Sequence, residues 1–263
     1  MAERLSKFTL FKIAFRSFFL QASWNYRGLM NMGFLYAISP GLDLIYDDKS
    51  MLEAAYVRHS EYFNTNPYFA SMVIGVILSL EERYSRGEIS ADVIHDAKEG
   101  LMTACAAIGD GLFWDSLRPF VAAVSLALAS KNILFTPLIF LLLYNIPHLY
   151  FRFSGIYWGY TEGTAVIGKL RRFQFPKIRK VLRYATLIIL AYLIPNHVNL
   201  HTTFFLNVRR DYFYILEKIV QGLGAISLTT LGVAACRASV DVLLISFLLM
   251  IFALVLYHWG ILI

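Results

Sequence analysis

The sequence predicts an all-α integral membrane protein with multiple transmembrane helices, re-entrant or broken half-helices and an N-terminal amphipathic helix. Residues 242–263 contain no Lys, Arg, Asp or Glu. At about 1.5 Å rise per residue, a helix of that length crosses a hydrocarbon core of roughly 30 Å. The stretches 132–151, 184–208 and 219–236 are similarly apolar. The chain is 58% hydrophobic and only 16% charged, whereas a soluble domain is about 25% charged.

The net charge of +6 comes largely from one short segment. Seven cations crowd residues 169–183, between apolar spans: Lys169, Arg171, Arg172, Lys177, Arg179, Lys180 and Arg183. Such a segment is typical of a cytoplasmic loop of a multi-pass protein. No basic patch is interleaved with a base-reading module, so we expect no nucleic-acid partner.

Residues 1–40 form the first predicted region, an amphipathic segment at the surface of the lipid bilayer with the N-terminus in the cytoplasm. Its phenylalanines alternate with Lys7, Lys12 and Arg16. A helix here carries an aromatic face and a basic face, as interfacial helices do. Packing of this helix on the protein's own core is an equally open alternative.

Residues 41–130 form the second region, with polar helices followed by re-entrant or broken segments. The segment 41–66 is polar, and Pro67 then marks the start of a new helix. The apolar stretch 68–80 has only 13 residues, too few to cross a bilayer. It is either an arm of a re-entrant hairpin or a helix of the protein core.

Residues 100–130 are apolar at both ends but interrupted in the middle. The interrupting residues are Gly109, Asp110, Gly111, Asp115, Arg118 and Pro119. This pattern predicts two half-helices that meet at a turn. Because non-helical backbone at membrane depth needs protein or a water-filled cavity around it, broken helices often mark transport sites.

Residues 131–263 form the third region, a transmembrane bundle. Helix 132–151 leads through a polar-aromatic stretch to the cytoplasmic basic loop 169–183. Three spans follow, at 184–206, 212–236 and 240–263. Glycines 155, 159 and 163 recur every four residues, which indicates a helix-packing surface.

Asp110 is the sharpest functional candidate, because an ionisable residue in an apolar segment costs several kcal/mol to bury. Trp114 offers an apolar ring face on which a sugar can stack. Asp115 and Arg118 lie three positions apart and are predicted to form an ion pair that holds the broken helix. The alternative is purely structural, with Asp110 capping the half-helix that follows it.

A second candidate site lies in the segment 21–33, around Trp24, Asn25 and Asn31. Neutral amides beside aromatic rings suit an uncharged, hydroxyl-rich ligand. A polar helix face at the membrane surface would have the same composition, so both interpretations stay open.

The residues indicate no cofactor, no metal site and no catalytic residue. His197 and His201 are four apart, but no Glu or Cys lies nearby to complete a metal site. Cys105 and Cys236 are far apart in apolar surroundings, as buried small residues are. No phosphate-binding glycine loop is present. An unrelated membrane enzyme is therefore the weakest hypothesis.

Five sequence motifs stand out along the chain: FRSFFLQASWNYRGLMNMGF at 15–34, EYFNTNPYFASMVIGVILSLEE at 61–82, AAIGDGLFWDSLRPFVA at 106–122, GYTEG at 159–163 and NHVN at 196–199. Together they resemble the IID component of mannose-family sugar phosphotransferase systems. The resemblance runs from about residue 10 to the C-terminus. The combination at 108–119 and the FNT-x-P run at 63–67 are its most specific parts.

The resemblance implies a bacterial inner-membrane subunit that forms the sugar-translocating unit with a IIC subunit, as a higher oligomer of IIC–IID pairs. Cytoplasmic IIA and IIB components relay phosphate from phosphoenolpyruvate, and IIB phosphorylates the sugar. IID itself holds no phosphorylated residue. Substrates in related systems include mannose, glucose, fructose, sorbose and amino sugars.

One departure from the family pattern affects the expected substrate. Where the family usually has Glu, Arg and Gln, this chain has Arg27, Gly28 and Met30. Either the substrate differs, for example by bearing negative charge, or the transport role has drifted. A scaffold that stabilises IIC and docks IIB through the basic loop 169–183 is the alternative function.

Overall fold

The computed structural model describes residues 5–197 and 241–258, together with positions 227, 230 and 234. The chain divides into two compact units, residues 1–186 and residues 187–263. Apart from positions 227, 230 and 234, the predicted span 212–236 lies outside the described residues, as do residues 198–206 of the predicted span 184–206, including His201. All the secondary-structure elements of the described residues are helices, as the sequence predicts.

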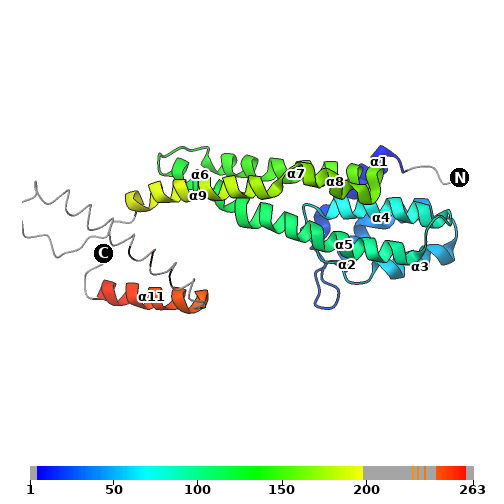
Figure 1. The fold of residues 1–263 in the computed structure, drawn as a ribbon, viewed down its shortest axis with the longest axis horizontal. Coiled ribbons are helices and arrows are strands. Elements are labelled where there is room, and N and C mark those ends of the chain that lie inside the picture. The colour runs from blue at the N-terminus through cyan, green and yellow to red at the C-terminus, as the bar shows by residue number, and fades with distance from the viewer. Residues whose placement is uncertain (1–4, 198–226, 228–229, 231–233, 235–240, 259–263) are drawn as a thin grey trace, which may run out of the picture. The chain divides into compact units, whose positions relative to one another are not determined.

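The described elements follow one another in the first unit, with the last helix in the second (Figure 1). They are α1 (Lys7–Arg16), η1 (Ser17–Phe19), α2 (Asn31–Ile45), α3 (Lys49–His59), α4 (Ala70–Ser85), α5 (Ala91–Gly109), the π-helical η2 (Asp110–Leu117), α6 (Arg118–Ala129), α7 (Thr136–Glu162), η3 (Gly163–Ala165), α8 (Val166–Arg172), α9 (Phe175–His197), which crosses the boundary between the units, and α11 (Val242–His258).

Helix α4 forms the centre of the first unit. It packs on α7, α5 and α2, and nearly all its residues are buried from Ala70 to Glu82. Of the two structures open for 68–80, the core helix is therefore the one observed. The helix continues beyond the apolar stretch, because Glu81 and Glu82 are buried and accept hydrogen bonds there.

Glycines set the close approach of α4 and α7. A Cβ at Gly159 would lie 2.2 Å from the Met72 carbonyl oxygen, and one at Gly75 would lie 2.3 Å from the Ile156 carbonyl oxygen. Any side chain at these positions would push the two backbones apart. The predicted packing surface is confirmed for Gly155 and Gly159, whereas Gly163 ends the helix at φ +56°.

The predicted turn near Gly109 is replaced by a continuous helix. Helices α5, η2 and α6 run without a break from Ala91 to Ala129, with a π-helical turn at the polar interruption. In an α-helix the Pro119 ring would collide with a carbonyl four residues back. The wider π-turn avoids this, and the Arg118 amide donates to the Phe113 carbonyl instead.

This continuous helix also bears on the membrane prediction. Of the helices in the described parts of the chain, Ala91–Ala129 is the one long and apolar enough to cross a bilayer. The spans that the sequence predicts after residue 131 differ in their bounds. Helix α7 begins at Thr136 and continues through the polar-aromatic stretch, because that stretch packs against α4.

The predicted basic loop 169–183 is mostly helical. It comprises the end of α8, a two-residue link and the first half of α9. Leu170 and Phe175 are buried between the cations, so the segment has an apolar face to pack. Lys and Arg are also good helix formers, which is why a cation-rich segment need not be a loop.

A buried carboxylate joins α2, α3 and α4. Glu81 receives two hydrogen bonds from Arg58, at 2.9 and 3.0 Å, and lies 2.6 Å from the His59 Nε2 atom. The Tyr46 hydroxyl donates to the same carboxylate. Burial raises the pKa of Glu81, but the bonds from His59, Arg58 and Tyr46 outweigh this effect and hold it at about 2.

Substitution of Gly159 by Ala should destabilise the protein by about 2 kcal/mol, because the new methyl group meets backbone rather than a flexible side chain. The matched control is Gly100→Ala, at an exposed helical position with no atom within 4 Å of the new Cβ. It should be neutral or stabilising by up to about 1 kcal/mol. Thermal unfolding in detergent measures both, and equal melting temperatures would contradict the close-contact interpretation.

Substitution of Glu81 by Gln should cost about 3 kcal/mol at neutral pH, because it leaves the largely buried Arg58 guanidinium without its carboxylate. The stabilisation by Glu81 is complete above its usual pKa of 4.5 and is lost as the pH falls toward about 2. Wild-type protein should therefore lose stability over that range more steeply than Glu81→Gln. The exposed pair Arg83–Glu88 supplies the control, and Glu88→Gln should cost less than about 1 kcal/mol.

Candidate functional site

Three segments join to form what we call the polar seam: the loop 20–30, the stretch 63–67 and the π-helix η2. The Met30 amide donates to the Phe63 carbonyl at 2.9 Å, and the Phe63 amide donates to the Gly28 carbonyl at 3.1 Å. At the other end of the stretch, Asn66 Nδ2 donates to Asp110 Oδ1 at 2.9 Å. Residues 63 and 66 are at most roughly 11 Å apart. The two predicted candidate regions therefore lie at opposite ends of one short stretch.

Asn25 organises the loop 20–30. Its Oδ1 atom accepts from the Gly28 amide at 2.8 Å and from the Arg27 amide at 3.1 Å. Its Nδ2 atom donates to Asn31 Oδ1 at 2.9 Å, and Asn31 Nδ2 donates to the Ser60 carbonyl at 2.6 Å. Both predicted amides are thus engaged in holding the loop. This use of the amides is a turn-forming role of the kind that Asn often has.

Gly28 lies close against the Asn31 side chain. A Cβ at this position would lie 2.2 Å from Asn31 Nδ2. The next residue, Leu29, adopts a left-handed φ of +53°, which a non-glycine residue rarely does. A larger residue at position 28 would therefore require the Asn31 side chain to move.

The tip of this loop is aromatic and exposed. Trp24 is 49% exposed and Tyr26 is 95% exposed, and their rings meet edge to face at 5.4 Å. Arg27 beside them is also exposed. In Figure 1 the loop extends as a blue trace away from the neighbouring helices. The predicted residue Trp24 thus presents an exposed ring surface at the tip of the loop.

Asp110 has one oxygen held and one open. Its partner Asn66 is 1% exposed, and the Asn66 Oδ1 atom accepts from the Tyr68 amide at 3.1 Å. The side chain of Asp110 is exposed, and its Oδ2 atom makes no bond to a residue that the structure describes. Asp110 lies within a continuous helix, so it does not cap a half-helix. It presents an acceptor next to an immobilised amide.

Trp114 lies nearly one π-turn beyond Asp110 and packs against aromatic and cationic groups. Its ring centre is 5.5 Å from that of Tyr68, and the Arg118 guanidinium carbon is 5.7 Å from the Trp114 ring. The predicted ion pair between Asp115 and Arg118 is not observed. Asp115 lies 3.7 Å from Arg183 and 3.8 Å from Arg179 instead.

The π-helical turn and the neighbouring helix α9 explain why Asp115 does not pair with Arg118. The π-turn changes the angle between residues three apart, and two cations of α9 reach Asp115 from the neighbouring helix. Arg179 lies directly over Gly111, where a Cβ would come within 2.2 Å of the guanidinium carbon. Two of the seven predicted loop cations therefore help to anchor the polar seam.

Sequence reasoning missed several polar residues behind the seam. Arg152 is 3% exposed, donates to Ser17 Oγ at 3.0 Å and stacks 4.3 Å from the Phe18 ring. His148 stacks on Tyr68 at 4.4 Å, and its ring nitrogens have no partner in the described parts of the chain. The only available signals were a lone Arg after an apolar stretch and a His after Pro147.

The exposed groups of the seam can bind hydroxyls rather than perform covalent chemistry. They comprise a carboxylate oxygen of Asp110 and the rings of Trp24 and Tyr26, and the partly buried ring of Trp114 lies beside that carboxylate. Carboxylate acceptors and aromatic faces suit a polyhydroxylated ligand. Within the described ranges, no group of three or more His, Cys, Asp and Glu side chains could hold a metal ion.

Comparison with known proteins places the chain among transport components. The family model described as "PTS system mannose/fructose/sorbose family IID component" matches residues 4–262. The mannose-specific EIID component of Escherichia coli K12 is 31% identical over 202 residues, which cover 75% of this chain and 71% of that protein. The fructose permease IID component of Bacillus subtilis 168 is 28% identical and covers 92% of each chain.

Two solved structures share the fold. One, titled "Structure of membrane protein", has a TM-score of 0.82 at 27% identity and covers 99% of both chains. The other is a chain in the cryo-EM structure of the mannose transporter ManYZ with microcin E492. It has a TM-score of 0.59 at 27% identity, again over 99% of both chains.

A double-mutant cycle tests the corrected ion pair. Asp115→Asn and Arg183→Gln should couple by about 0.5 kcal/mol, the usual value for a half-exposed pair. The cycle of Asp115→Asn with Arg118→Gln should show coupling close to zero. Unfolding free energies of the three single and two double variants give both values, and stronger coupling to Arg118 would restore the pair that the sequence predicts.

Proposed function

The chain belongs to the IID family of mannose/fructose/sorbose phosphotransferase systems, and from this premise we propose that it works as the IID subunit of a sugar-translocating complex. It is a protein of sugar transport in the bacterial inner membrane. In the proposed complex it pairs with a IIC subunit, as a higher oligomer of such pairs. Its similarity to a chain of the ManYZ mannose transporter supports this partner. Cytoplasmic IIB and IIA components supply the phosphate of phosphoenolpyruvate.

The Asp110 carboxylate is the observation that carries the proposed sugar contact. It interrupts the apolar helix Ala91–Ala129, where a charge is costly unless it has a function or a partner. Asn66 fixes one oxygen, so the other is held in a defined direction. A fixed carboxylate oxygen is a strong acceptor for sugar hydroxyls. Trp114 adds a ring surface beside it.

The loop 20–30 has a different part in this proposal. Asn25 and Asn31 position the loop through their mutual hydrogen bond, and Trp24 supplies the binding surface. The two relatives are named for mannose and fructose, and the family model also names sorbose, so they do not single out one sugar for this chain. Arg27 on the exposed tip favours a ligand or partner surface with negative character.

A non-transporting scaffold that stabilises IIC and docks IIB is the second candidate. Arg171, Arg172 and Lys177 favour it, because all three are exposed and make no ion pair within the described ranges. Such cations suit an acidic cytoplasmic partner. In the proposed topology this basic segment and the N-terminus both face the cytoplasm.

The variant Asp110→Asn separates the two candidates. It keeps an oxygen for Asn66 but removes the charge, so the complex should assemble while sugar uptake falls about tenfold. A hydrogen bond to a charged group is worth about 1.5–3 kcal/mol, which sets this magnitude. Uptake of labelled mannose, fructose and sorbose by cells that depend on this transporter is the measurement.

The matched control is Asp96→Asn, which makes the same chemical change at an exposed position on the same helix. It should leave uptake unchanged. Unaltered uptake in both variants, with normal amounts of IIC in the membrane, would remove Asp110 from the sugar path and favour the scaffold. Loss of IIC together with uptake would show that Asp110 serves assembly.

A further inference from the structure

Helix α1 shows an aromatic face on its exposed side. Its Leu10, Ile13 and Ala14 are buried against the bundle. Phe8 is nevertheless 77% exposed and Phe15 is 55% exposed. Burying such a ring is worth about 2 kcal/mol, so several exposed rings in one row indicate a surface that meets apolar material.

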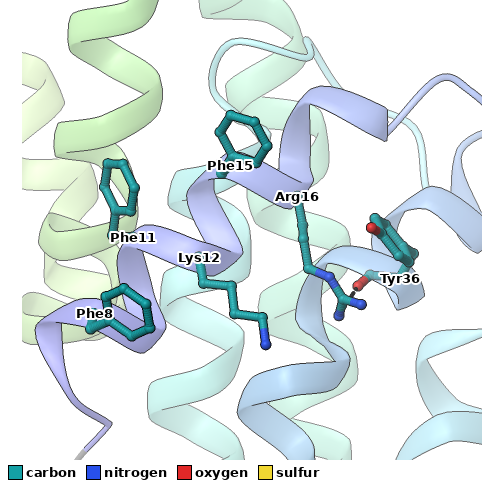
Figure 2. A pocket seen from close by; sticks show the side chains of 6 residues that line it. All are labelled: Phe8, Phe11, Lys12, Phe15, Arg16 and Tyr36. Carbon is teal, nitrogen blue, oxygen red and sulfur yellow. Dashed lines mark hydrogen bonds between the residues drawn. The ribbon is translucent and has the colours of Figure 1, made fainter.

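A groove runs beside this row, with a volume of about 440 Å³. Figure 2 shows Arg16 extending from α1 to Tyr36 of α2 and Lys12 extending on the same side of the helix, while the rings of Phe11 and Phe15 project on the other side. The groove is lined by Phe8, Phe11, Lys12, Phe15, Arg16 and Tyr36. Its lining is therefore basic and aromatic, and no carboxylate takes part in it.

The two cations differ in how they are held. Arg16 donates to the Tyr36 carbonyl and to Ser39 Oγ, both at 3.0 Å, and its guanidinium carbon is 4.1 Å from the Tyr36 ring centre. These contacts fix it at the wall of the groove. Lys12, one helical turn away, makes no hydrogen bond or ion pair with any residue that the structure describes. The groove thus has one fixed positive charge and one mobile positive charge.

We infer that this groove binds one anionic phospholipid, with its phosphate between Lys12 and Arg16 and its acyl chains along Phe8, Phe11 and Phe15. The phosphate suits two cations one helical turn apart, since Lys and Arg both bind phosphate oxygens strongly. The phenylalanines match acyl chains. Basic residues next to an apolar helix face are the features by which proteins recognise anionic lipid.

Other occupants fit the groove less well. A sugar could stack on a ring but would find no carboxylate or amide acceptor in the lining for its hydroxyls. Inorganic phosphate would use the cations but not the rings. A neutral lipid would use the rings but not Lys12. Only a ligand with a negative head and an apolar tail uses the whole lining.

Native mass spectrometry of the full detergent-solubilised chain, with any subunit that co-purifies, tests this inference. The probes are a short-chain phosphatidylglycerol, a phosphatidylcholine of the same chain length, and inorganic phosphate. Phosphatidylglycerol should bind as one tight equivalent and phosphatidylcholine more weakly. Lys12→Gln should weaken phosphatidylglycerol binding about fivefold, as expected for the loss of one basic residue at an anionic lipid.

Lys7→Gln is the matched control, since Lys7 is an exposed cation on the same helix but does not line the groove. It should leave binding unchanged, and Lys12→Arg should restore it. Phe8→Ser should weaken phosphatidylglycerol without affecting inorganic phosphate.

Several results would overturn the proposal. Equal binding of the two lipids, or equal losses for Lys7→Gln and Lys12→Gln, would leave only non-specific adsorption. Displacement of the lipid by millimolar inorganic phosphate would indicate a simple anion site. Absence of lipid because a co-purified subunit or a second copy covers α1 would assign the groove to a protein interface.

Discussion

The close approach of α4 and α7 supports the rest of the first unit. Backbone meets backbone there because Gly75 and Gly159 carry no side chain. The crossing lets α4 be buried from every side, and it fixes the stretch 63–67 that leads into α4. That stretch in turn holds the loop 20–30 at one end and Asp110 at the other. A wider crossing would therefore shift the candidate site as well as the core.

The π-helical turn in the helix Ala91–Ala129 reconciles two opposing demands. An apolar helix at membrane depth must keep its backbone hydrogen-bonded, because unpaired groups there cost several kcal/mol. Pro119 cannot join the regular pattern. Widening the helix at Asp110–Leu117 keeps a continuous backbone and leaves the side chains of Asp110 and Asp115 exposed. π-Bulges of this kind frequently occur at functional sites.

Much of the fold could be predicted from the sequence, and the limits have physical causes. The helical class, the polar interruption at Asp110 and the glycine packing surface follow from composition and spacing. The turn at Gly109 was wrong because glycine and proline do not reveal whether a helix breaks or widens. The Asp115–Arg118 pair was wrong because its better partners, Arg179 and Arg183, lie more than 60 residues away in sequence. A core role for 68–80 was one of two open interpretations, since periodicity alone does not separate a buried helix from a re-entrant arm.

The hydrogen bonds of the polar seam distinguish the residues that hold it together from those that can face a ligand. Asn25 and Asn31 look alike in sequence to a pair of sugar-binding amides, yet their polar atoms are engaged with each other and with the backbone. Asn66 is engaged on both sides as well. Asp110 differs from all three, because one oxygen is fixed and the other is open. At membrane depth a carboxylate in an apolar helix is costly unless it has a function or a partner. A ligand with hydroxyl donors would be such a partner, which is the physical reason for proposing the sugar contact at Asp110 rather than at the amides.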